Sequence, residues 1–474
     1  MTSLVWFRQD LRLSDNPALT HAAKLGSIVP VYVLDETPAP AGRPLGGASR
    51  WWLHHSLKAL AKSLGGLILL RGDPADVLPA LIAQTGASGL YWNRCYEPHA
   101  IARDKALKTS LASAGIDVAS FNASLLFEPW QVRTLNGGPY KVYSPFWRAC
   151  QRLSVDAARS PVKPKLAPLE QLGDRLSDWG LLPVKPNWAR GFEAEWTPGE
   201  TGAQERLETF LDAGLSGYGE LRNRPDLPNV SRLSPHLHWG EISPRQIYAA
   251  THARLAAHAH LRKDAEKFLA ELGWREFAYH LLYHFPTLPD QNWKSGFDAY
   301  PWQVNARHLA AWQRGATGYP IVDAGMRELW ATGYMHNRVR MVVASFLIKH
   351  LRIDWRDGEA WFWDTLLDAD LANNAASWQW VAGSGADAAP YYRIFNPITQ
   401  GQKFDPNGRY TRRWCPELQR LPDAVLHAPF LAPPDVLTAA GVVLGKTYPH
   451  PLVDHADARQ AALAGYEAVK DAAN

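Results

Sequence analysis

The sequence predicts an α/β segment with a doubly wound parallel sheet, followed by a connector and an all-α segment. In residues 1–130, short apolar runs alternate with helical patterns, which is typical of a parallel sheet covered by helices. Prolines accumulate over residues 131–202, which indicates a long connector at the surface. Over residues 203–474 the hydrophobic pattern is helical, which predicts a helical bundle.

The apolar runs place individual elements. The expected strands cover residues 4–7, 28–34, 67–70, 90–92 and 118–121. The clearest helical patterns cover residues 48–64, 100–114, 265–282, 326–351 and 456–470. The turn after the first strand, RQDLRLSDNPAL, lacks a glycine fingerprint and so does not support the usual dinucleotide site.

Composition leaves several functional classes open. The formal net charge is only +4, which neither requires nor excludes nucleic acid, because polyanion binding depends on a local basic patch. Cys95, Cys150 and Cys415 match no disulfide or metal spacing, so we expect reduced thiols in a cytosolic protein. We expect neither a signal peptide nor a membrane span, because there is no charged leader with an apolar core and no apolar run of 18 residues.

Residues 366–397 have the highest density of hydrogen-bonding side chains in an apolar setting. The stretch contains two acidic residues, two carboxamides and two tryptophans, namely Asp368, Asp370, Asn373, Asn374, Trp378 and Trp380. A buried segment must satisfy such groups, and a ligand rich in ring nitrogens and carbonyls is a natural partner. We therefore expect a cofactor pocket here.

A second motif lies around Ser234. The Ser234–Pro235 pair predicts an N-cap and a first-turn proline, with Ser231 and Arg232 just ahead of the helix. Free amides, hydroxyls and a guanidinium at a helix start form a diphosphate site. An ordinary capped helix is the competing interpretation.

Two helical segments carry polar groups on otherwise apolar faces. Glu271 and Trp274 are three residues apart, as are Asn337 and Arg340, and Met341 follows one turn after Asn337. Such faces suit a pocket wall, and core packing with an interhelical salt bridge explains them equally well.

Tryptophan is unusually frequent, with 21 residues. Trp302, Trp355 and Trp378 lie in separate segments, and a closely spaced row of easily oxidised indoles would carry electrons to a buried redox centre. The sequence alone favours core packing for these three.

No metal site is expected. Asp368 and Asp370 resemble the start of a calcium loop, but the following residues lack the further ligand and the turn glycine. His280 and His284 are one helical turn apart, but position 281 lacks the glutamate of a zinc-protease helix.

Together, the motifs resemble the photolyase and cryptochrome family over essentially the whole chain. They are, in order, WFRQDLRLSDNPAL, SRLSPHL, WREF, TGYPIVDAGMREL, MHNRVRM, IDWRDGE, DADLANN, WQW and APYYRIFNP. The likeness is closest to bacterial class I photolyases that repair cyclobutane pyrimidine dimers. It implies a light-driven carbon–carbon lyase in which excited FADH⁻ lends an electron to the dimer.

The resemblance assigns residues to the cofactor. It implies an antenna domain over residues 1–130 and a helical catalytic domain over residues 203–474 that binds FAD and DNA. The residues that match FAD contacts are Tyr218, Ser231, Arg232, Leu233, Ser234, Arg340, Asp368, Ala369, Asp370 and Asn374. Asn374 matches the group that faces the reactive N5 edge, and Trp378, Trp355 and Trp302 match a photoreduction chain.

The resemblance also implies a substrate, UV-damaged DNA, and a protein that acts as a monomer in the bacterial cytoplasm. The residues that match the dimer pocket are Glu271, Trp274, Asn337, Arg338, Met341 and Trp380, and Arg393 and Lys403 are expected to hold the DNA backbone. A dimer must be flipped out of the duplex for repair, and its bases then need aromatic faces. Trp274 and Trp380 would supply these faces, Glu271 a hydrogen bond to the lesion and Arg338 a phosphate contact.

Two alternatives remain. Six-four photolyases carry histidines where this chain has Asn337 and Met341, which argues against that chemistry. Cryptochromes tend to carry Asp or Cys at the position of Asn374, so a blue-light photoreceptor is the second interpretation. A light-independent flavin or nucleotide-binding module is the third.

Some positions depart from the family pattern. Val230 replaces a threonine before SRLS, and Tyr334 replaces the commoner tryptophan before MHNR. His99 and Ala100 stand where folate-binding relatives have an Asn-Glu pair, which disfavours methenyltetrahydrofolate bound in that manner. The segments GGASRWWLHHSL and YWNRCYEPH look more like relatives that bind 8-hydroxy-deazaflavin, and an empty antenna site is the remaining alternative.

Overall fold

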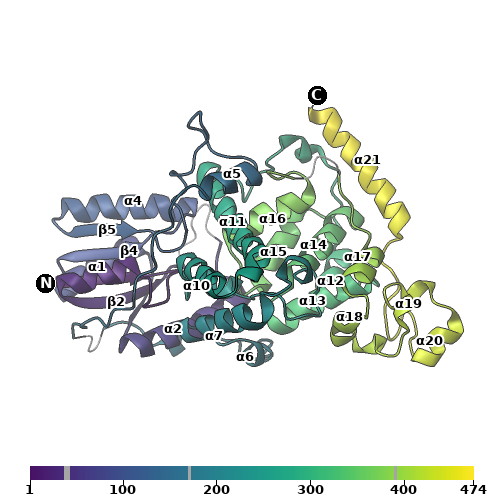
Figure 1. Ribbon diagram of the computed structural model, residues 1–474, viewed down its shortest axis with the longest axis horizontal. Helices are drawn as coiled ribbons and strands as arrows, with labels where there is room; N and C mark the ends of the chain where they lie inside the picture. Colours follow the sequence, from purple (N-terminus) through teal and green to yellow (C-terminus); the bar gives the residue numbers. More distant parts are fainter. Residues whose placement is uncertain (37–42, 169–171, 389–391, 474) are drawn as a thin grey trace. The chain divides into compact units, whose positions relative to one another are not determined.

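The computed structural model describes residues 1–36, 43–168, 172–388 and 392–473. The chain forms two compact units. The first unit comprises Met1–Ser216, Ser231–Pro286 and Leu367–Ala372, and the second unit comprises Gly217–Val230, Thr287–Leu366 and Asn373–Asn474. The predicted fold class is confirmed, because a five-stranded parallel sheet at the N-terminus is followed by helices (Figure 1). The three-part division at residues 130 and 202 follows different lines and stays a prediction.

The sheet of the first unit has the strand order β3-β2-β1-β4-β5, and every neighbouring pair is parallel. Its strands are β1 (Thr2–Phe7), β2 (Ser27–Leu34), β3 (Ile68–Arg71), β4 (Gly89–Asn93) and β5 (Asp117–Phe121). Each lies within two residues of its expected bounds. The order reverses between β1 and β4, as in a doubly wound sheet.

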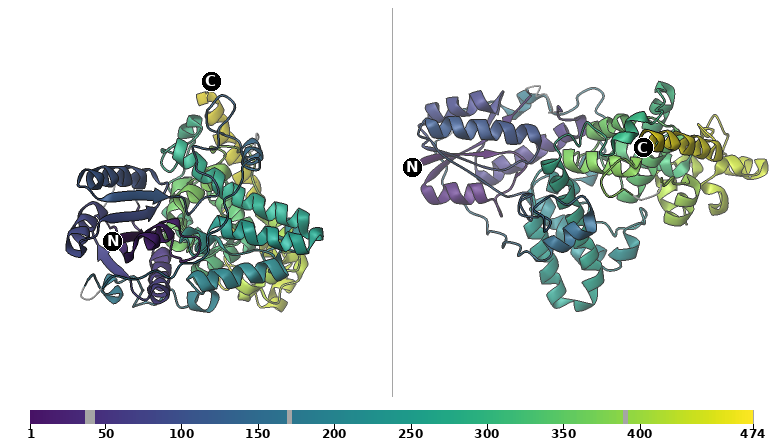
Figure 2. Two further views of the ribbon diagram at one scale, coloured as in Figure 1. Left: turned by 60° about the vertical axis from the view of Figure 1, so that its left-hand side comes forward. Right: turned by 90° about the horizontal axis from the view of Figure 1, so that it is seen from above.

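Helices cover both faces of this sheet (Figure 2). They are α1 (Pro17–Leu25), α2 (Gly47–Leu64), α3 (Pro74–Thr85) and α4 (Pro98–Ser113). Side chains alternate along a strand, so Leu4 and Trp6 face a core shared with α3 and α4, whereas Val5 and Phe7 point to the other face. Burial of both sets explains why β1 is an unbroken apolar run.

The helical part of the first unit includes two helices inside the predicted connector. Its helices are α5 (Tyr143–Cys150), α6 (Phe192–Glu195), α7 (Glu200–Thr209), α9 (Ser234–His238), α10 (Pro244–Ala257) and α11 (Arg262–His284). Helix α10 begins with a capping box, in which Ser243 and Gln246 each bond to the other's backbone.

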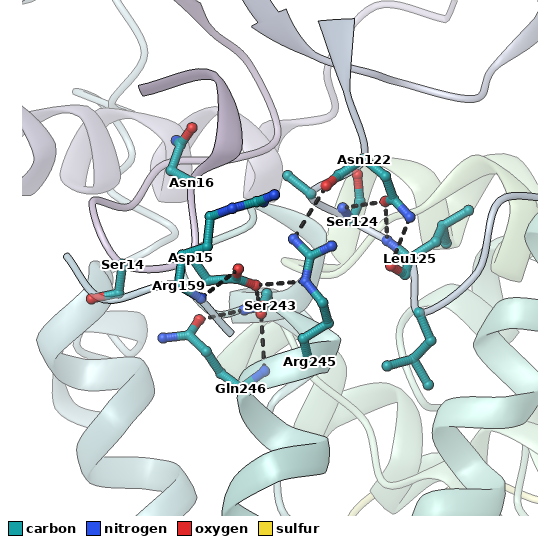
Figure 3. Close-up of polar contacts among 12 residues, drawn as sticks. Ser14, Asp15, Asn16, Asn122, Ser124, Leu125, Arg159, Ser243, Arg245 and Gln246 are labelled. Carbon is teal, nitrogen blue, oxygen red and sulfur yellow. Dashed lines mark hydrogen bonds and ion pairs between the residues drawn. The ribbon is translucent and has the colours of Figure 1, made fainter. Parts of the chain in front are cut away.

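Asp15 joins the sheet to α10 and to the connector (Figure 3). Its carboxylate accepts hydrogen bonds from the Ser243 hydroxyl at 2.6 Å, from Nε of Arg245 at 2.9 Å and from the backbone N–H of Arg159 at 3.0 Å. Burial alone would raise the pKa of Asp15, but Arg245 and Ser243 outweigh it and lower that pKa. The first unit is therefore fastened at the turn after its first strand.

The second unit consists of helices and turns within its described residues. Its helices are α8 (Tyr218–Leu221), α12 (Ala306–Gln313), α13 (Pro320–Thr332), α14 (Asn337–Ser345), α15 (Trp355–Thr365), α17 (Pro397–Phe404), α18 (Arg409–Trp414), α19 (Asp423–Leu426), α20 (Pro434–Ala440) and α21 (His455–Ala473). Helix α16 (Leu371–Ala382) begins in the last two residues of the first unit.

The prediction of one continuous helical run over residues 326–351 is wrong. Helix α13 ends at Thr332 because Gly333 takes a left-handed conformation, with φ 66°. Helix α14 begins at Asn337, where the His336 side chain caps the backbone N–H of Arg338 at 3.1 Å.

The described ranges contain neither a candidate membrane span nor a candidate metal site. No helix in them is long and apolar enough to cross a bilayer. No group of three His, Cys, Asp or Glu side chains in them is arranged to hold a metal ion.

Candidate functional site

The structure describes every expected site residue and divides them between the two units. The first unit contains Ser231, Arg232, Leu233, Ser234, Glu271, Trp274, Asp368, Ala369 and Asp370. The second unit contains Tyr218, Trp302, Asn337, Arg338, Arg340, Met341, Trp355, Asn374, Trp378, Trp380, Arg393 and Lys403. Residues 389–391, which open the APYYRIFNP motif, lie outside the described residues.

Asp370 lies among side chains from two helices of the first unit. Tyr279 of α11 donates its hydroxyl to Oδ2 of Asp370, and Nδ1 of His238 on α9 lies 3.7 Å from the same oxygen. Burial alone would raise the pKa of Asp370, but His238, Arg275 and Tyr279 outweigh it and hold the pKa below its ordinary value. The segment therefore presents an ionised carboxylate, which is the acceptor that a ring N–H requires.

The residues before Asp370 are buried as well. The carbonyl of Leu367 accepts a hydrogen bond from Nε1 of Trp239 at 3.2 Å, which anchors the start of the segment. Asp368 and Ala369 follow and are almost fully buried. The segment from Leu367 to Asp370 is thus held by the backbone carbonyl at its start and by the carboxylate at its end.

The expected diphosphate motif takes a different form from the prediction. Ser234 is not an N-cap, because Leu233 already has helical dihedral angles and its carbonyl accepts the first helical bond from Leu237 at 2.9 Å. Helix α9 therefore begins at the serine itself. Arg232 has a left-handed backbone, with φ 51°, and its guanidinium donates to Glu195 at 3.0 Å.

Glu271 and Trp274 lie one turn apart on α11. Oε1 of Glu271 is 3.3 Å from Nζ of Lys267, which is one turn earlier. The half-buried indole of Trp274 stacks on the ring of Tyr143 from α5, with centroids 3.7 Å apart and planes within 9°. A carboxylate and a flat ring are thus held next to each other on the helix surface.

Arg338 is the centre of a basic cluster in the second unit. Its Nε and one terminal nitrogen donate to Oδ1 of Asn223 at 3.3 and 2.7 Å, and its guanidinium lies 4.6 Å from the ring centroid of Phe404. Burial, followed by the charges of Arg222 and Arg393, lowers the pKa of Arg338. The positive charges of Arg222 and Arg393 near the Arg338 guanidinium favour the binding of an anion such as a phosphate beside it.

Helix α14 places the rest of its motif around this cluster. Asn337 and Met341 lie one turn apart at the start of the helix, and Asn337 is exposed. Burial and the nearby arginines lower the pKa of His336 to about 3, so this N-cap is neutral. Nε of Arg340 donates to the carbonyl of Met335 at 2.7 Å, and its guanidinium lies over the ring of Tyr334.

Asn374 and Tyr218 are the remaining expected cofactor residues of the second unit. Nδ2 of Asn374 donates to the carbonyl of Glu359 at 3.1 Å, which fixes the orientation of the carboxamide. Tyr218 is buried, and the guanidinium of Arg222 lies 5.6 Å from its ring centroid.

The three tryptophans expected to carry electrons do not contact one another through their rings, within the part of the chain that the structure describes. Trp378 packs edge-on against Trp312 and Phe362, with centroids 6.3 and 5.0 Å away. Nε1 of Trp355 donates to Oδ1 of Asn292 at 3.0 Å. The ring centroids of Trp302 and Tyr300 are 4.4 Å apart. Their role in electron transfer stays a prediction.

Trp380 and Arg393 line a small hollow of the second unit. Nε1 of Trp380 donates to the carbonyl of Asp387 at 3.0 Å. The hollow also contains Ser345 and Lys349, and burial together with Arg393 lowers the pKa of Lys349 to about 7. Lys403 lies over the ring of Phe404 and so borders the Arg338 cluster.

Several contributing residues were missed by the sequence analysis. They are Tyr143, Arg222, Asn223, His238 and Tyr279. His238 belongs to the motif region SRLSPHLHW and Tyr279 follows WREF, so proximity to a motif was the only available signal. Arg222 and Asn223 lie 115 or more positions from Arg338. Tyr143 lies in the predicted connector, which shows no hydrophobic periodicity.

Comparisons with known proteins give two family matches along the chain. Residues 3–165 match the family model described as DNA photolyase. Residues 268–468 match the model described as the FAD binding domain of DNA photolyase.

Individual relatives agree with these matches over nearly the whole length. A deoxyribodipyrimidine photo-lyase of Agrobacterium fabrum is 54% identical over 98% of this chain and 98% of its own. Cryptochrome-1 of Arabidopsis thaliana is 40% identical over 96% of this chain and 69% of its own. Among solved structures, a bacterial class III photolyase from Agrobacterium tumefaciens has a TM-score of 0.95 at 54% identity, covering 99% of this chain and 98% of its own.

Proposed function

Because this chain belongs to the photolyase and cryptochrome family, we propose that it repairs cyclobutane pyrimidine dimers in DNA with the energy of blue light. The observation that carries the proposal is the Arg338 cluster, a set of three arginines whose central guanidinium is fixed by Asn223 and Phe404. A fixed basic cluster suits a polyanion with regularly spaced phosphates.

FAD is the cofactor of the proposed reaction, and the residues expected to hold it have the donors and acceptors that it needs. The donor and acceptor set expected around the flavin contains an ionised carboxylate at Asp370, an oriented carboxamide at Asn374 and the guanidinium of Arg340. These groups match the ring N–H, the carbonyls and the reactive edge of an isoalloxazine. When bound in its fully reduced form and excited by light, FAD supplies the electron that opens the cyclobutane ring and afterwards takes it back.

The protein's own side chains bind and orient the lesion. Trp274 and Trp380 offer flat surfaces for the two joined bases of a flipped-out dimer. Glu271 offers a carboxylate for a hydrogen bond to the lesion, and Asn337 and Met341 complete the expected pocket. Arg338, Arg393 and Lys403 contact phosphates, so binding weakens as salt rises.

Three further expectations belong to this proposal. Trp378, Trp355 and Trp302 deliver electrons that reduce the flavin before repair, and the protein acts as a cytoplasmic monomer. An 8-hydroxy-deazaflavin is favoured over methenyltetrahydrofolate as an antenna, because His99 and Ala100 replace the Asn-Glu pair of folate-binding relatives. The emission spectrum of the chromophore released from purified protein distinguishes these two antennas.

A blue-light photoreceptor is the second candidate function. The observation in its favour is the 40% identity to a plant cryptochrome over 96% of this chain. Asn374, where cryptochromes tend to carry Asp or Cys, favours repair over this alternative.

The test is a repair assay with purified protein. The flavin is photoreduced with blue light, and a thymine-dimer oligonucleotide is followed by the return of its base absorbance in light and in darkness. We expect recovery only in light, and a loss of about tenfold in Trp274→Ala or Trp380→Ala, because each removes a stacking surface for one base. In Trp302→Phe we expect slow photoreduction but normal repair once the flavin is reduced chemically. Normal flavin reduction without any ring opening would favour the photoreceptor.

A further inference from the structure

Tyr143 and Trp274 form a parallel ring pair that links two helices of the first unit. Their centroids are 3.7 Å apart and their planes differ by 9°, so the two faces are in full contact. Tyr143 is the first residue of α5, and Trp274 is in the middle of α11. Trp274 stands in the WREF motif, whereas Tyr143 stands in no motif that the sequence offers.

The pair is held by the turn of α11 that contains Trp274. The Tyr143 hydroxyl donates to the carbonyl of Ala270 at 2.6 Å, four residues before the tryptophan. Gly273 leaves room for this arrangement, because a Cβ there would lie 2.6 Å from the ring of Trp147 and 2.9 Å from the Tyr143 hydroxyl. The tyrosine is therefore anchored at its tip and over its face.

This arrangement occupies one face of the Trp274 indole. Tyr143 covers one side of the indole, and Phe277 packs edge-on against it, with the two ring centroids 6.1 Å apart. Trp274 is only half-buried, so part of its surface remains exposed outside the stack with Tyr143. A further planar ring can stack on this indole only on the face opposite Tyr143, and the stack with Tyr143 already restricts the rotation of the indole.

We propose that Tyr143 is a positioning residue that fixes Trp274 for stacking on one base of a flipped-out pyrimidine dimer, and so contributes to the preference for damaged over undamaged DNA. The inference rests on the proposed function and extends it to a residue outside the expected pocket. Undamaged DNA places no base against Trp274, so only the damaged complex gains from a fixed indole.

The experiment compares the dissociation constants of one oligonucleotide with and without a thymine dimer, in darkness, for the FAD-loaded protein. In Tyr143→Leu we expect the affinity for the dimer to fall five- to tenfold, because the indole must now be ordered on binding. The affinity for the undamaged strand stays the same. Tyr143→Phe keeps the stack and loses only the hydroxyl anchor, so a loss of about twofold is expected.

Phe146→Leu is the matched control. Phe146 is buried on the same helix and packs against Phe277 and His280, and among the described residues its ring makes no ring contact with Trp274. It should reduce thermal stability and leave the ratio of the two affinities unchanged. An equal loss of the ratio in Phe146→Leu would mean that α5 acts only through general stability, and the proposal would be wrong.

A double-mutant cycle with Trp274→Ala separates this inference from the proposed function. In the Trp274→Ala background, Tyr143→Leu should have no further effect on dimer affinity. If Trp274→Ala leaves dimer affinity unchanged, the proposed lesion pocket fails. If Trp274→Ala lowers it but Tyr143→Leu does not, only the positioning role fails.

Discussion

Asp370 and Glu276 are both buried carboxylates of the first unit, and both feel the charge of Arg275, yet their pKa values move in opposite directions. The pKa of Asp370 is held below its ordinary value, because His238, Arg275 and Tyr279 outweigh the burial. The pKa of Glu276 is raised to about 7, because burial outweighs Arg275 and two backbone amides. Similar burial therefore gives an ionised group in one place and, in the other, a group that is about half protonated near pH 7.

The difference comes from how the partners are distributed. Oε2 of Glu276 accepts both backbone N–H groups, from Leu126 at 2.9 Å and Phe127 at 3.2 Å. Oε1 has no hydrogen-bond partner among the described residues and lies 3.7 Å from a nitrogen of Arg275. Asp370 instead receives a hydroxyl and faces an imidazole at the same oxygen. The two carboxylates therefore differ in their hydrogen-bond donors: a tyrosine hydroxyl donates to Asp370, which also faces an imidazole, whereas within the described chain only backbone amides donate to Glu276.

Glu276 and Asp370 also differ in the tasks that their surroundings indicate. Glu276 holds residues 126–127 against α11 by accepting hydrogen bonds from their backbone N–H groups. This structural role does not require a negative charge. Asp370 belongs to the segment expected to bind FAD, where a permanent negative charge orients a ring N–H. The two groups should therefore show opposite pH signatures, which the following variants test.

Glu276→Gln should give the largest effect, which is a change in the pH dependence of stability. The unfolded pKa is about 4.5 and the folded pKa about 7, so the native state keeps the proton that the unfolded state has lost between these values. Raising the pH through this window therefore removes up to about 3 kcal/mol from the free energy of unfolding. The glutamine variant should lack this loss, as measured by urea unfolding at pH 5 and pH 8. An identical pH slope in both proteins would show that Glu276 is ionised throughout.

Asp370→Asn should reduce the free energy of unfolding by about 2 to 3 kcal/mol at pH 7, because a charged acceptor of buried donors is lost. The pKa of Asp370 is lowered on folding, so its stabilisation is present above the unfolded pKa and is lost as the pH falls through the folded value. The gap between variant and native protein should therefore close in acid. Asp435→Asn, at the exposed start of α20, is the control and should change stability by less than about 0.5 kcal/mol. A gap that is constant with pH would contradict the ionised state.

The sequence predicted the fold well because its signals are local. Alternating apolar runs and helical patterns placed all five strands within two residues, and β-branched and aromatic side chains buried on both faces explain why. The failure at residues 326–351 is equally physical. Gly333 and His336 interrupt the backbone for only four residues, and the hydrophobic pattern continues across the gap because α13 and α14 pack together.

The sequence predicted those residues of the candidate site that stand in motifs. It did not predict the residues that contact them and hold them in place. Asp370 and Trp274 stand in motifs, whereas Tyr279 is 91 positions from Asp370 and the Tyr143 hydroxyl is 127 positions from the carbonyl that it binds. Such pairings exist only in the folded chain, and no local pattern encodes them. The prediction that Ser234 is an N-cap was wrong for the opposite reason. The Ser234–Pro235 pair is a strong local signal, but the backbone of Leu233 is already helical in the folded chain.

Tyr279→Phe gives the smallest change and tests which partner keeps Asp370 ionised. Removing one hydroxyl that donates to a carboxylate should lower the free energy of unfolding by about 1.5 kcal/mol at pH 7. The folded pKa of Asp370 should also rise toward its unfolded value, so acid unfolding should begin at a higher pH. Tyr283→Phe is the matched control, since Tyr283 lies one turn further along α11 and packs against Trp130 and His284. If Tyr279→Phe lowers stability without moving the acid transition, the hydroxyl contributes only packing and one neutral bond. His238 and Arg275 would then account for the low pKa, and the contrast with Glu276 would reduce to the presence of a single imidazole.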